Sequence, residues 1–363
     1  MKILISAYLD NNLGDDLMIK MVAKELSSHK LYLCNSDSIV KKSFEDLENI
    51  FFLDESIYNI DYSIFDVFLK VGGSMFIIDS IGGIKQRIRE IILLNKLKKY
   101  KIKKIAIGSN YGPLSMKFSE KILKTELKKY DLLTVRDEES FDLLKKFDFK
   151  KTSYYKFDDL VFDLNVSNLR NKSTSCSNAN VLGISGYRPK NRKDSYYFYK
   201  NLAYVCDDYI ESMNGSIKLI AFDSENENDI SACYHIQNLS KHPSKIEIIS
   251  YIGNSDTILE EINKCSHFIA IRFHAAVISE LLNIPYFSIA YSNKMINLAK
   301  DRGNLQRVIN LSSFTKLNLL EDNEILKFEN YYRNQKRDYS SSGHFTKVKQ
   351  LIKEIGDSNR KKI

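Results

Sequence analysis

The sequence predicts an α/β protein of two domains, each built on a parallel sheet, with a cleft between them. Three observations carry this prediction. A chain of 363 residues is long enough for two domains. Short apolar runs typical of strands alternate with helical segments from one end to the other, a pattern that builds parallel sheets covered by helices. A polar stretch rich in Ser and Asn and without periodicity, residues 165–180, separates two such series.

The first series contains four strands with helices between them. The predicted strands are residues 2–8, 66–71, 103–109 and 131–136. The predicted helices are residues 15–29, 84–100, 118–130 and 137–147. In the first helix, apolar residues recur at intervals of three and four, which is the spacing of one buried helix face.

The second series repeats this order. Its predicted strands are residues 181–185, 217–222, 246–251, 267–272 and 285–291, and its predicted helices lie near residues 194–213, 226–240, 255–264 and 274–283. We therefore expect an N-terminal α/β domain at residues 1–165, a C-terminal one at 178–335, and a helix with a basic tail at 336–363. Ligands of such domains bind at the carboxyl ends of the strands, here at the cleft.

Composition excludes several classes of protein. The chain is 44% hydrophobic and 28% charged, which rules out wholesale disorder, and no apolar run approaches the roughly 20 residues of a membrane span. The opening "MKILISAYLD" reaches an acidic residue too early for a secretory signal and is typical of a strand. The five cysteines form no CxxC pair, which argues against a zinc site and a disulfide framework. We expect a soluble, cytoplasmic protein.

A formal net charge of +8 suits anionic partners. No helix-turn-helix or RNA-binding signature is present, so we expect no nucleic-acid partner. The one dense basic run, "KLKKYKIKK" at residues 96–104, is compatible with peripheral contact with an anionic membrane face. A solvated helix face is the simpler alternative.

Three loops that follow strands could carry chemistry: residues 10–16, 70–76 and 107–113. In the first, Asp15 or Asp16 could present an acid to a hydroxylated substrate, but either could equally cap the helix that follows. In the second, Gly72 and Gly73 allow backbone N–H groups to approach a ligand beside Ser74, and tight packing is the alternative. Neither loop is a dinucleotide fingerprint or a P-loop.

Two arginines occupy the corresponding position at other strand ends. Arg136 ends a strand directly before Asp137, which we expect to cap the following helix. Arg188 lies just past the first strand of the second series. Each could bind an anion, although pairing with a neighbouring acid is the more common fate of a lone arginine.

The stretch at residues 270–294 is the most informative one. Arg272 ends a strand and His274 falls in the first turn of the next helix, where free N–H groups and the helix dipole favour anions. Lys294 follows the next strand. Together they predict an anion site with a proton-transfer group at one sheet edge, the alternative being a structural histidine and an ordinary basic rim.

At this point the sequence resembles the polysaccharide pyruvyl transferase family. The resemblance rests on "RFHAAVISELLNIPYFSIAYSNK" and, in order, on "NLGDD", "VGGSMF", "GSNYGP", "RDEES" and "DDLVF". These motifs are individually weak but specific as an ordered set, and they span about residues 3–302. Serine stands in "VGGSMF" where many members have a third glycine, and "GSNYGP" has fewer glycines than is usual.

The resemblance implies two Rossmann-like domains in a GT-B-type arrangement. It also implies transfer of pyruvate from phosphoenolpyruvate onto a sugar diol as a ketal, during bacterial cell-surface polysaccharide synthesis. On this basis His274 would be catalytic with Arg272 beside it binding the donor, and further substrate contacts would come from Lys294, Arg136, Arg188, Asp15, Asp16, Gly72, Gly73 and Ser74. The C-terminal domain would take the donor and the N-terminal domain the acceptor, which could be lipid-linked. No metal or cofactor is expected.

Two other functions remain open. One is a GT-B-type glycosyltransferase that uses a nucleotide sugar and would share the two domains and the basic cleft. The other is a non-catalytic protein that binds anions or a membrane surface.

Overall fold

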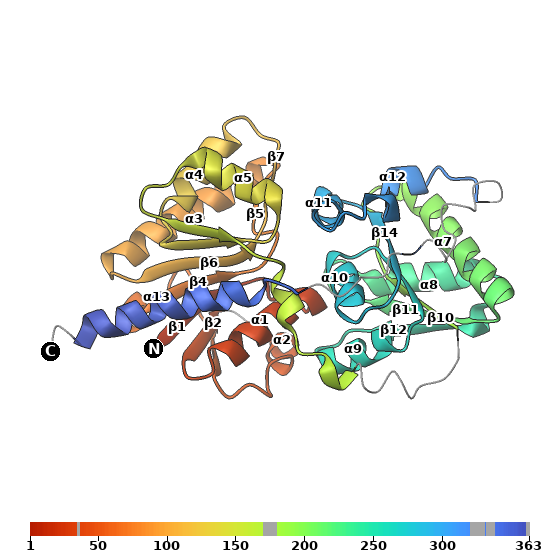
Figure 1. Ribbon diagram of the computed structural model, residues 1–363, viewed down its shortest axis with the longest axis horizontal. Coiled ribbons are helices and arrows are strands. Elements are labelled where there is room, and N and C mark those ends of the chain that lie inside the picture. Colours follow the sequence, from red (N-terminus) through yellow and green to blue (C-terminus); the bar gives the residue numbers. More distant parts are fainter. Residues whose placement is uncertain (35–36, 170–179, 320–330, 332–337, 361–363) are drawn as a thin grey trace. The chain divides into compact units, whose positions relative to one another are not determined.

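The computed structural model describes residues 1–34, 37–169, 180–319, 331 and 338–360 (Figure 1). The chain forms two compact units, which are described separately. Unit 1 comprises residues 1–9, 17–163 and 339–363, and unit 2 comprises residues 10–16 and 164–338. The predicted class is confirmed: both units are α/β with parallel sheets of Rossmann type. Most of the predicted linker, residues 170–179, lies outside the described residues, and the predicted cleft stays a prediction.

Unit 1 is built on a seven-stranded parallel sheet with the order β3-β2-β1-β4-β6-β8-β9. Its strands are β1 (Lys2–Ser6), β2 (Lys30–Cys34), β3 (Ile50–Leu53), β4 (Val67–Val71), β6 (Lys103–Ser109), β8 (Leu132–Val135) and β9 (Ser153–Lys156). A short pair, β5 (Phe76–Ile78) and β7 (Tyr111–Leu114), forms a separate two-stranded sheet. All four predicted strands are present. The prediction missed β2, β3 and β9, which are short and partly exposed. Polar residues interrupt β2 and β9, and β3 is an apolar run of only four residues.

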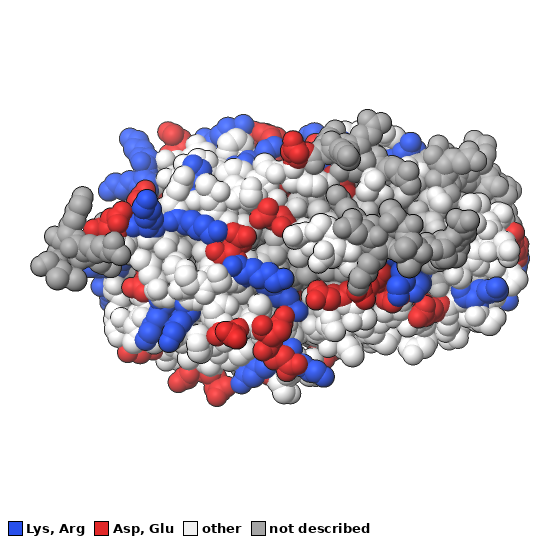
Figure 2. All heavy atoms as spheres, turned by 60° about the horizontal axis from the view of Figure 1, so that its bottom comes forward, with Lys and Arg blue, Asp and Glu red and all other residues white. Residues whose placement is uncertain are grey.

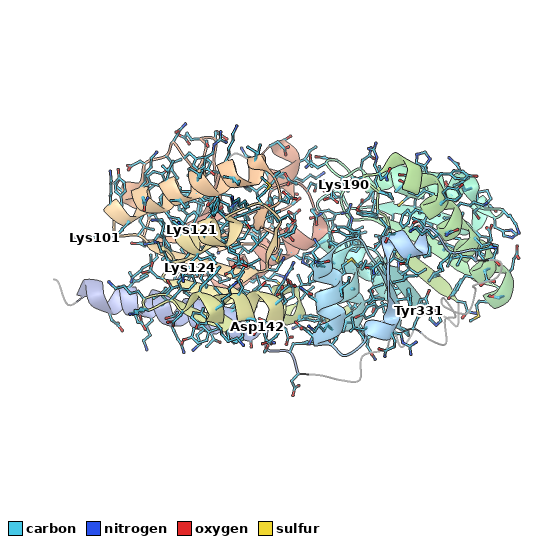
Figure 3. The ribbon with its side chains drawn as sticks, turned by 90° about the horizontal axis from the view of Figure 1, so that it is seen from above. Lys101, Lys121, Lys124, Asp142, Lys190 and Tyr331 are labelled. Atoms are coloured by element: carbon cyan, nitrogen blue, oxygen red, sulfur yellow. The ribbon has the colours of Figure 1, made fainter. Side chains whose placement is uncertain are left out.

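Helices cover both faces of this sheet (Figure 1). They are α1 (Leu13–Glu25), α2 (Ser38–Lys42), α3 (Ile81–Lys99), α4 (Ser119–Leu127), α5 (Glu138–Phe147) and α13 (Ser342–Arg360), with 3-10 turns at η1 (Tyr62–Ile64) and η2 (Leu160–Asp163). The helices α3, α4 and α5 bury their leucines against alternate residues of β1, β4, β6 and β8. The C-terminal helix α13 packs against β6 and η2. In Figure 3, Lys121 and Lys124 of α4 and Lys101, just after α3, are labelled in this unit.

Unit 2 has a six-stranded parallel sheet with the order β12-β11-β10-β13-β14-β15. Its strands are β10 (Val181–Ser185), β11 (Ser216–Ala221), β12 (Ile246–Ser250), β13 (His267–Ala270), β14 (Tyr286–Ala290) and β15 (Val308–Asn310). Its helices are α7 (Arg192–Met213), α8 (Asp229–Leu239), α9 (Ser255–Asn263), α10 (Phe273–Leu281), α11 (Asn293–Asp301) and α12 (Leu311–Phe314), with 3-10 turns at η3 (Pro243–Lys245) and η4 (Leu305–Arg307). The core under α7 and α8 is apolar and nearly closed to solvent. Every strand predicted for this half is present.

The strand order positions the functional edges. In both sheets the order reverses beside the first strand, between β1 and β4 in unit 1 and between β10 and β13 in unit 2. Loops diverge at such a switch point, so the carboxyl ends of these strands are where a doubly wound sheet binds ligands. The early loop also contributes to unit 2: the backbone N–H of Leu13 donates to the carbonyl oxygen of Phe222 at 3.1 Å.

Surface charge is mixed on the face shown in Figure 2, where Lys and Arg interleave with Asp and Glu. None of the helices in the described ranges is both long and apolar enough to cross a bilayer.

Candidate functional site

A backbone junction at the switch point of unit 2 organises the first group of site residues. The strand β13 ends just before Arg272, and the helix α10 begins just after it. The backbone N–H groups of Ile271 and Arg272 donate to the hydroxyl oxygen of Ser185, at 2.7 and 3.1 Å. Because Ser185 ends β10, this hydroxyl joins the two central strands at the point where the chain turns into α10. The hydroxyl of Ser185 therefore holds the start of α10, which carries His274, against the end of β10.

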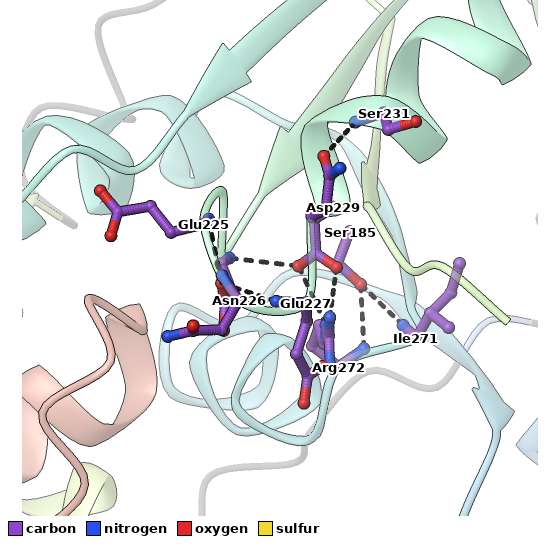
Figure 4. A network of polar contacts seen from close by, with 10 residues as sticks. Ser185, Glu225, Asn226, Glu227, Asp229, Ser231, Ile271 and Arg272 are labelled. Atoms are coloured by element: carbon purple, nitrogen blue, oxygen red, sulfur yellow. Dashed lines mark hydrogen bonds and ion pairs between the residues drawn. The ribbon is translucent and has the colours of Figure 1, made fainter. Parts of the chain in front are cut away.

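The side chain of Arg272 is held by acidic residues (Figure 4). Its Nε donates to Oδ2 of Asp229 at 3.0 Å, and a second nitrogen pairs with the other oxygen of the same carboxylate. The third nitrogen pairs with Glu227. The Asp229 side chain is fully buried, whereas that of Glu227 is 54% exposed. Burial raises the pKa of Asp229 to about 8, and the guanidinium against both its oxygens favours the charged form.

Two stacked tyrosines lie against this arginine. The rings of Tyr187 and Tyr291 are 4.5 Å apart between centroids, and the Arg272 guanidinium carbon lies 5.0 and 6.0 Å from those centroids. The ammonium of Lys294 approaches the Tyr291 ring at 5.4 Å. Burial would raise the pKa of Tyr291, but Lys294 and Arg272 outweigh it and hold that pKa below its usual value. Two cations and a phenol of unusual acidity therefore meet here.

His274 lies beside this cluster, in the first turn of α10 and half-buried. Its ring contacts that of Phe273 edge to face at 5.2 Å between centroids, and the Lys294 ammonium lies 5.9 Å from the Phe273 ring. On its other side the imidazole fills the space above Gly14, where a β-carbon would overlap it. The structure thus brings His274, Lys294 and Arg272 to one edge of the unit 2 sheet.

The loop at residues 10–16 completes this edge. It forms a bridge with Asp223 through Asn12, whose side chain accepts from the N–H of Gly14 at 3.1 Å. The Tyr251 hydroxyl donates to Asp16 at 2.6 Å. Because α1 begins at Leu13, the alternative that Asp15 or Asp16 caps this helix is wrong; both lie inside its first turn.

Arg188 has a different environment. It is exposed, in the loop after β10. Burial raises the pKa of Tyr199 on α7 to about 12, and the charge of Arg188 nearby opposes that rise. Its role as a substrate contact stays a prediction.

Unit 1 contains a second polar group, at the carboxyl ends of its own central strands. The guanidinium of Arg136, after β8, donates to Asp159 and to the side-chain oxygen of Asn110, each at 2.7 Å. The Arg136 and Asp159 side chains are 3% and 2% exposed. Arg136 therefore pairs with a neighbouring acid, which was the alternative to a free anion-binding arginine. The expected cap at Asp137 is present, since its carboxylate accepts from the N–H of Ser140 at 2.7 Å.

The glycine turn packs against this arginine. A β-carbon on Gly73 would overlap the guanidinium of Arg136, and Gly72 has a φ of 139°, a conformation that favours glycine. Ser74 donates weakly to Asn110 at 3.5 Å, and its carbonyl accepts from the Tyr8 hydroxyl at 3.2 Å. Tight packing thus accounts for both glycines, and their contact with a ligand stays a prediction.

Sequence reasoning missed the partners of the predicted cations. These are Asp159, Asn110, Asp229, Glu227, Tyr187 and Tyr291. Asp159, Asn110 and Tyr291 lie inside motifs already singled out, so their position in a motif was the available signal. Asp229 and Glu227 fall inside a predicted helix, near residues 226–240, and carry no such signal. Among the described residues, no group of three or more His, Cys, Asp or Glu could hold a metal ion.

Solved structures with the same fold include several enzymes of nucleotide sugars. The UDP-GlcNAc 2-epimerase of Methanocaldococcus jannaschii is 11% identical, with a TM-score of 0.59, over 97% of this chain and 99% of that one. The UDP-GlcNAc 2-epimerase of Neisseria meningitidis, bound to UDP-GlcNAc, is 13% identical, with a TM-score of 0.57, over 97% and 100%. HepE of Anabaena, in complex with UDP-glucose, is 10% identical, with a TM-score of 0.56, over 99% and 100%. These likenesses establish the fold alone.

Sequence comparison identifies the family. No curated protein matches the chain significantly. The model of the family described as polysaccharide pyruvyl transferase matches residues 12–293, which include most of the early loop, the Arg136 group and the Arg272–His274 junction. The chain belongs to the polysaccharide pyruvyl transferase family.

Proposed function

We propose that this protein transfers pyruvate from phosphoenolpyruvate to two hydroxyl groups of a saccharide, forming a ketal. The observation that carries the proposal is the convergence of Arg272, Lys294 and His274 at the switch point of unit 2. Family membership supports a transferase that acts on polysaccharide or its precursors. The cytoplasmic setting expected from the sequence is part of the proposal.

The donor carries a phosphate and a carboxylate, so its site needs fixed positive charge. Lys294 supplies one cation, and the N-terminus of α10 adds the partial charge of its free N–H groups. Arg272 supplies a second cation. Two of its three nitrogens are committed to buried Asp229, but the third pairs with exposed Glu227, a carboxylate that a more highly charged donor can replace.

The reaction moves two protons. C3 of phosphoenolpyruvate gains a proton and becomes a methyl group, which makes C2 electrophilic. The first sugar oxygen bonds to C2 and loses its proton, and the bond from C2 to the phosphate oxygen breaks with its electron pair on phosphate. The second sugar oxygen then closes the ring. One of the two hydroxyl protons balances the new methyl hydrogen and the other leaves with phosphate.

His274 is the residue that we assign to this proton transfer. A positioned acid–base group contributes roughly 10²–10⁴-fold to such steps. Tyr291 is a second candidate for proton transfer, because Lys294 and Arg272 hold its pKa below the usual value. We place the acceptor on unit 1, where Asn110 and Ser74 offer hydrogen-bonding groups at the carboxyl edge of the sheet.

Phosphate release from phosphoenolpyruvate, dependent on added saccharides, tests the proposal. We expect His274→Ala to lower turnover by about two orders of magnitude and leave donor binding largely intact. The matched control is His29→Ala, a half-buried histidine just before β2. If His274→Ala keeps normal turnover, the assignment of His274 as the catalytic residue is wrong. If no saccharide triggers phosphate release, the proposed reaction is wrong.

A second candidate is transfer from a nucleotide sugar. It is favoured by the similar solved structures whose bound ligands are UDP-GlcNAc and UDP-glucose. A thermal-shift comparison separates the two, because a ligand that binds only the folded protein raises its melting temperature. Stabilisation by phosphoenolpyruvate but not by UDP-sugars supports pyruvyl transfer, and the reverse supports the second candidate.

A further inference from the structure

The outward face of α3 is unusual for the surface of a water-soluble domain. Three isoleucines, Ile81, Ile88 and Ile92, are 66%, 47% and 51% exposed. They are spaced seven and four residues apart, so they form a single stripe along the helix. The opposite side of the same helix holds the leucines Leu93, Leu94 and Leu97, which are buried in the core of unit 1. The stripe therefore points directly away from the sheet.

Cations flank this stripe and acids do not. The exposed cations of the helix are Lys85, Arg89, Lys96, Lys98 and Lys99. All residues of α3 are described, and its single acid, Glu90, is buried and paired with Lys70 at 2.9 Å. We call the three isoleucines and these five cations the α3 face.

The neighbouring helix extends the pattern. The helix α4 packs beside α3, and Phe118 at its start is 64% exposed. Three lysines of this segment, Lys121, Lys124 and Lys128, are exposed, and Figure 3 labels two of them. The acids of α4 are neutralised, since Glu120 pairs with Lys146 and Glu126 is buried against Arg87. This contrasts with the mixed charge of the face in Figure 2.

We propose that the α3 face docks unit 1 onto an anionic lipid surface. A helix with an apolar stripe and exposed cations beside it lies in the plane of a bilayer interface, with the apolar side chains between acyl chains and the cations among phosphates. A second copy of this chain fits poorly, because a symmetric contact would bring like charges together. A protein groove fits less well than lipid, since α3 exposes five cations and no acid along its length and so needs anions beside the whole stripe.

The basic run of the sequence, residues 96–104, overlaps the α3 face only in part. Lys103 and Lys104 belong to β6, where both pair with Asp131, at 3.1 and 3.3 Å. They are not part of the α3 face. The isoleucines, which lie before that run, are what turn a basic helix into an interfacial one.

Co-sedimentation of the full chain with vesicles tests the inference without reference to the reaction. We expect binding to vesicles of phosphatidylcholine mixed with phosphatidylglycerol, no binding to phosphatidylcholine alone, and weaker binding as salt rises. Lys85→Gln with Lys99→Gln should weaken partitioning by about fivefold per charge. Ile88→Ser with Ile92→Ser should abolish binding.

The matched control exchanges one exposed isoleucine and one exposed lysine of unit 2, Ile252→Ser with Lys245→Gln, and should bind like the unaltered chain. Circular dichroism confirms that each variant is folded. Equal binding to neutral vesicles, no binding to either kind, or binding that survives both α3 variants overturns the inference. A concentration-dependent dimer that the isoleucine substitutions abolish would assign the face to a second copy and also overturn it.

Discussion

The imidazole of His274 occupies the space that a side chain on residue 14 would need, so Gly14 and His274 are a matched pair. Residues 10–16 are distant from α10 in sequence, yet they pack in the same unit. The glycine lies in the first turn of α1, where its backbone conformation would also suit alanine. The lack of a side chain at Gly14 therefore leaves the room that the His274 imidazole occupies.

Gly14→Ala should lower turnover while changing the overall fold little. The new methyl group would displace the His274 ring, and a misplacement of about 1 Å can cost roughly 10²-fold in rate. Steady-state kinetics and melting temperature measure the two effects. The control is Gly82→Ala, also in the first turn of a helix, where the new carbon would meet only the Ser80 hydroxyl at 3.6 Å. Normal turnover in a folded Gly14→Ala variant would contradict the assignment of His274.

Arg272→Met should destabilise unit 2, because it leaves Asp229 buried without its cation. Removing one partner of a buried ion pair costs about 3–5 kcal/mol. Burial already raises the pKa of Asp229 to about 8, so in this variant the folded protein would keep a proton on Asp229 that the unfolded chain releases above about pH 4. The loss of stability should therefore grow as the pH rises toward about 8. Urea unfolding at several pH values measures this trend.

The double variant, Arg272→Met with Asp229→Asn, separates the ion pair from other effects of Arg272. Removing both charges should recover most of the lost stability, while donor binding should stay weak because the cation is still missing. If the single and double variants are equally unstable, the pair with Asp229 does not explain the position of Arg272.

The sequence predicted the fold class and nearly all the central strands, because buried parallel strands are continuous apolar runs that periodicity identifies. It failed at β2, β3 and β9, which lie toward the edges of the sheet. The strands β2 and β9 carry mixed side chains, and β3 is only four residues long. It also placed residues 10–16 with the N-terminal half, since nothing in their composition shows that Leu13 bonds to Phe222.

The sequence predicted the cations of the site and His274, but not the side chains that pair with those cations. Arg136 in unit 1, and Arg272 and Lys294 in unit 2, stand out as charges after apolar strands, and parallel topology brings such positions to one edge within each sheet. Their partners depend on tertiary contacts between loops far apart in sequence, such as the 43 residues that separate Asp229 from Arg272. A lone sequence gives no measure of such distances, so an arginine that is paired cannot be told from one that is free.

Glu227→Gln should raise the affinity for phosphoenolpyruvate. In the structure this exposed carboxylate occupies the nitrogen of Arg272 that does not face Asp229. A donor phosphate or carboxylate must displace it, and removing its charge removes the competition. The glutamine would replace a contact between two charges, worth about 1.5–3 kcal/mol, by one with a neutral amide that is weaker by about 1 kcal/mol, so the KM for the donor should fall several-fold with kcat little changed. The control is Glu225→Gln, an exposed acid in the same loop. A higher KM in Glu227→Gln would mean that Glu227 assists binding.

The last prediction concerns His344, which the sequence placed outside both domains. The structure buries it completely in unit 1. Its Nε2 lies 2.7 Å from the carbonyl oxygen of Asp158, which can only accept, so Nε2 carries the proton and Nδ1 accepts from the Thr134 hydroxyl at 2.6 Å. Burial lowers the pKa of His344 from 6.5 to about 4, despite the nearby carboxylate of Asp159.

Acid should therefore destabilise unit 1 through His344. Below pH 6.5 the unfolded chain binds a proton at this residue that the folded chain refuses until about pH 4. The free energy of unfolding should thus fall between these values, by up to about 1.4 kcal/mol per pH unit. Hydrogen exchange of the β8 peptide across this range measures the effect locally. His344→Gln should be less stable at neutral pH but lose less on acidification, whereas His242→Gln, an exposed histidine paired with Glu211, should keep the slope. If His344→Gln retains the full slope, other groups carry the acid sensitivity.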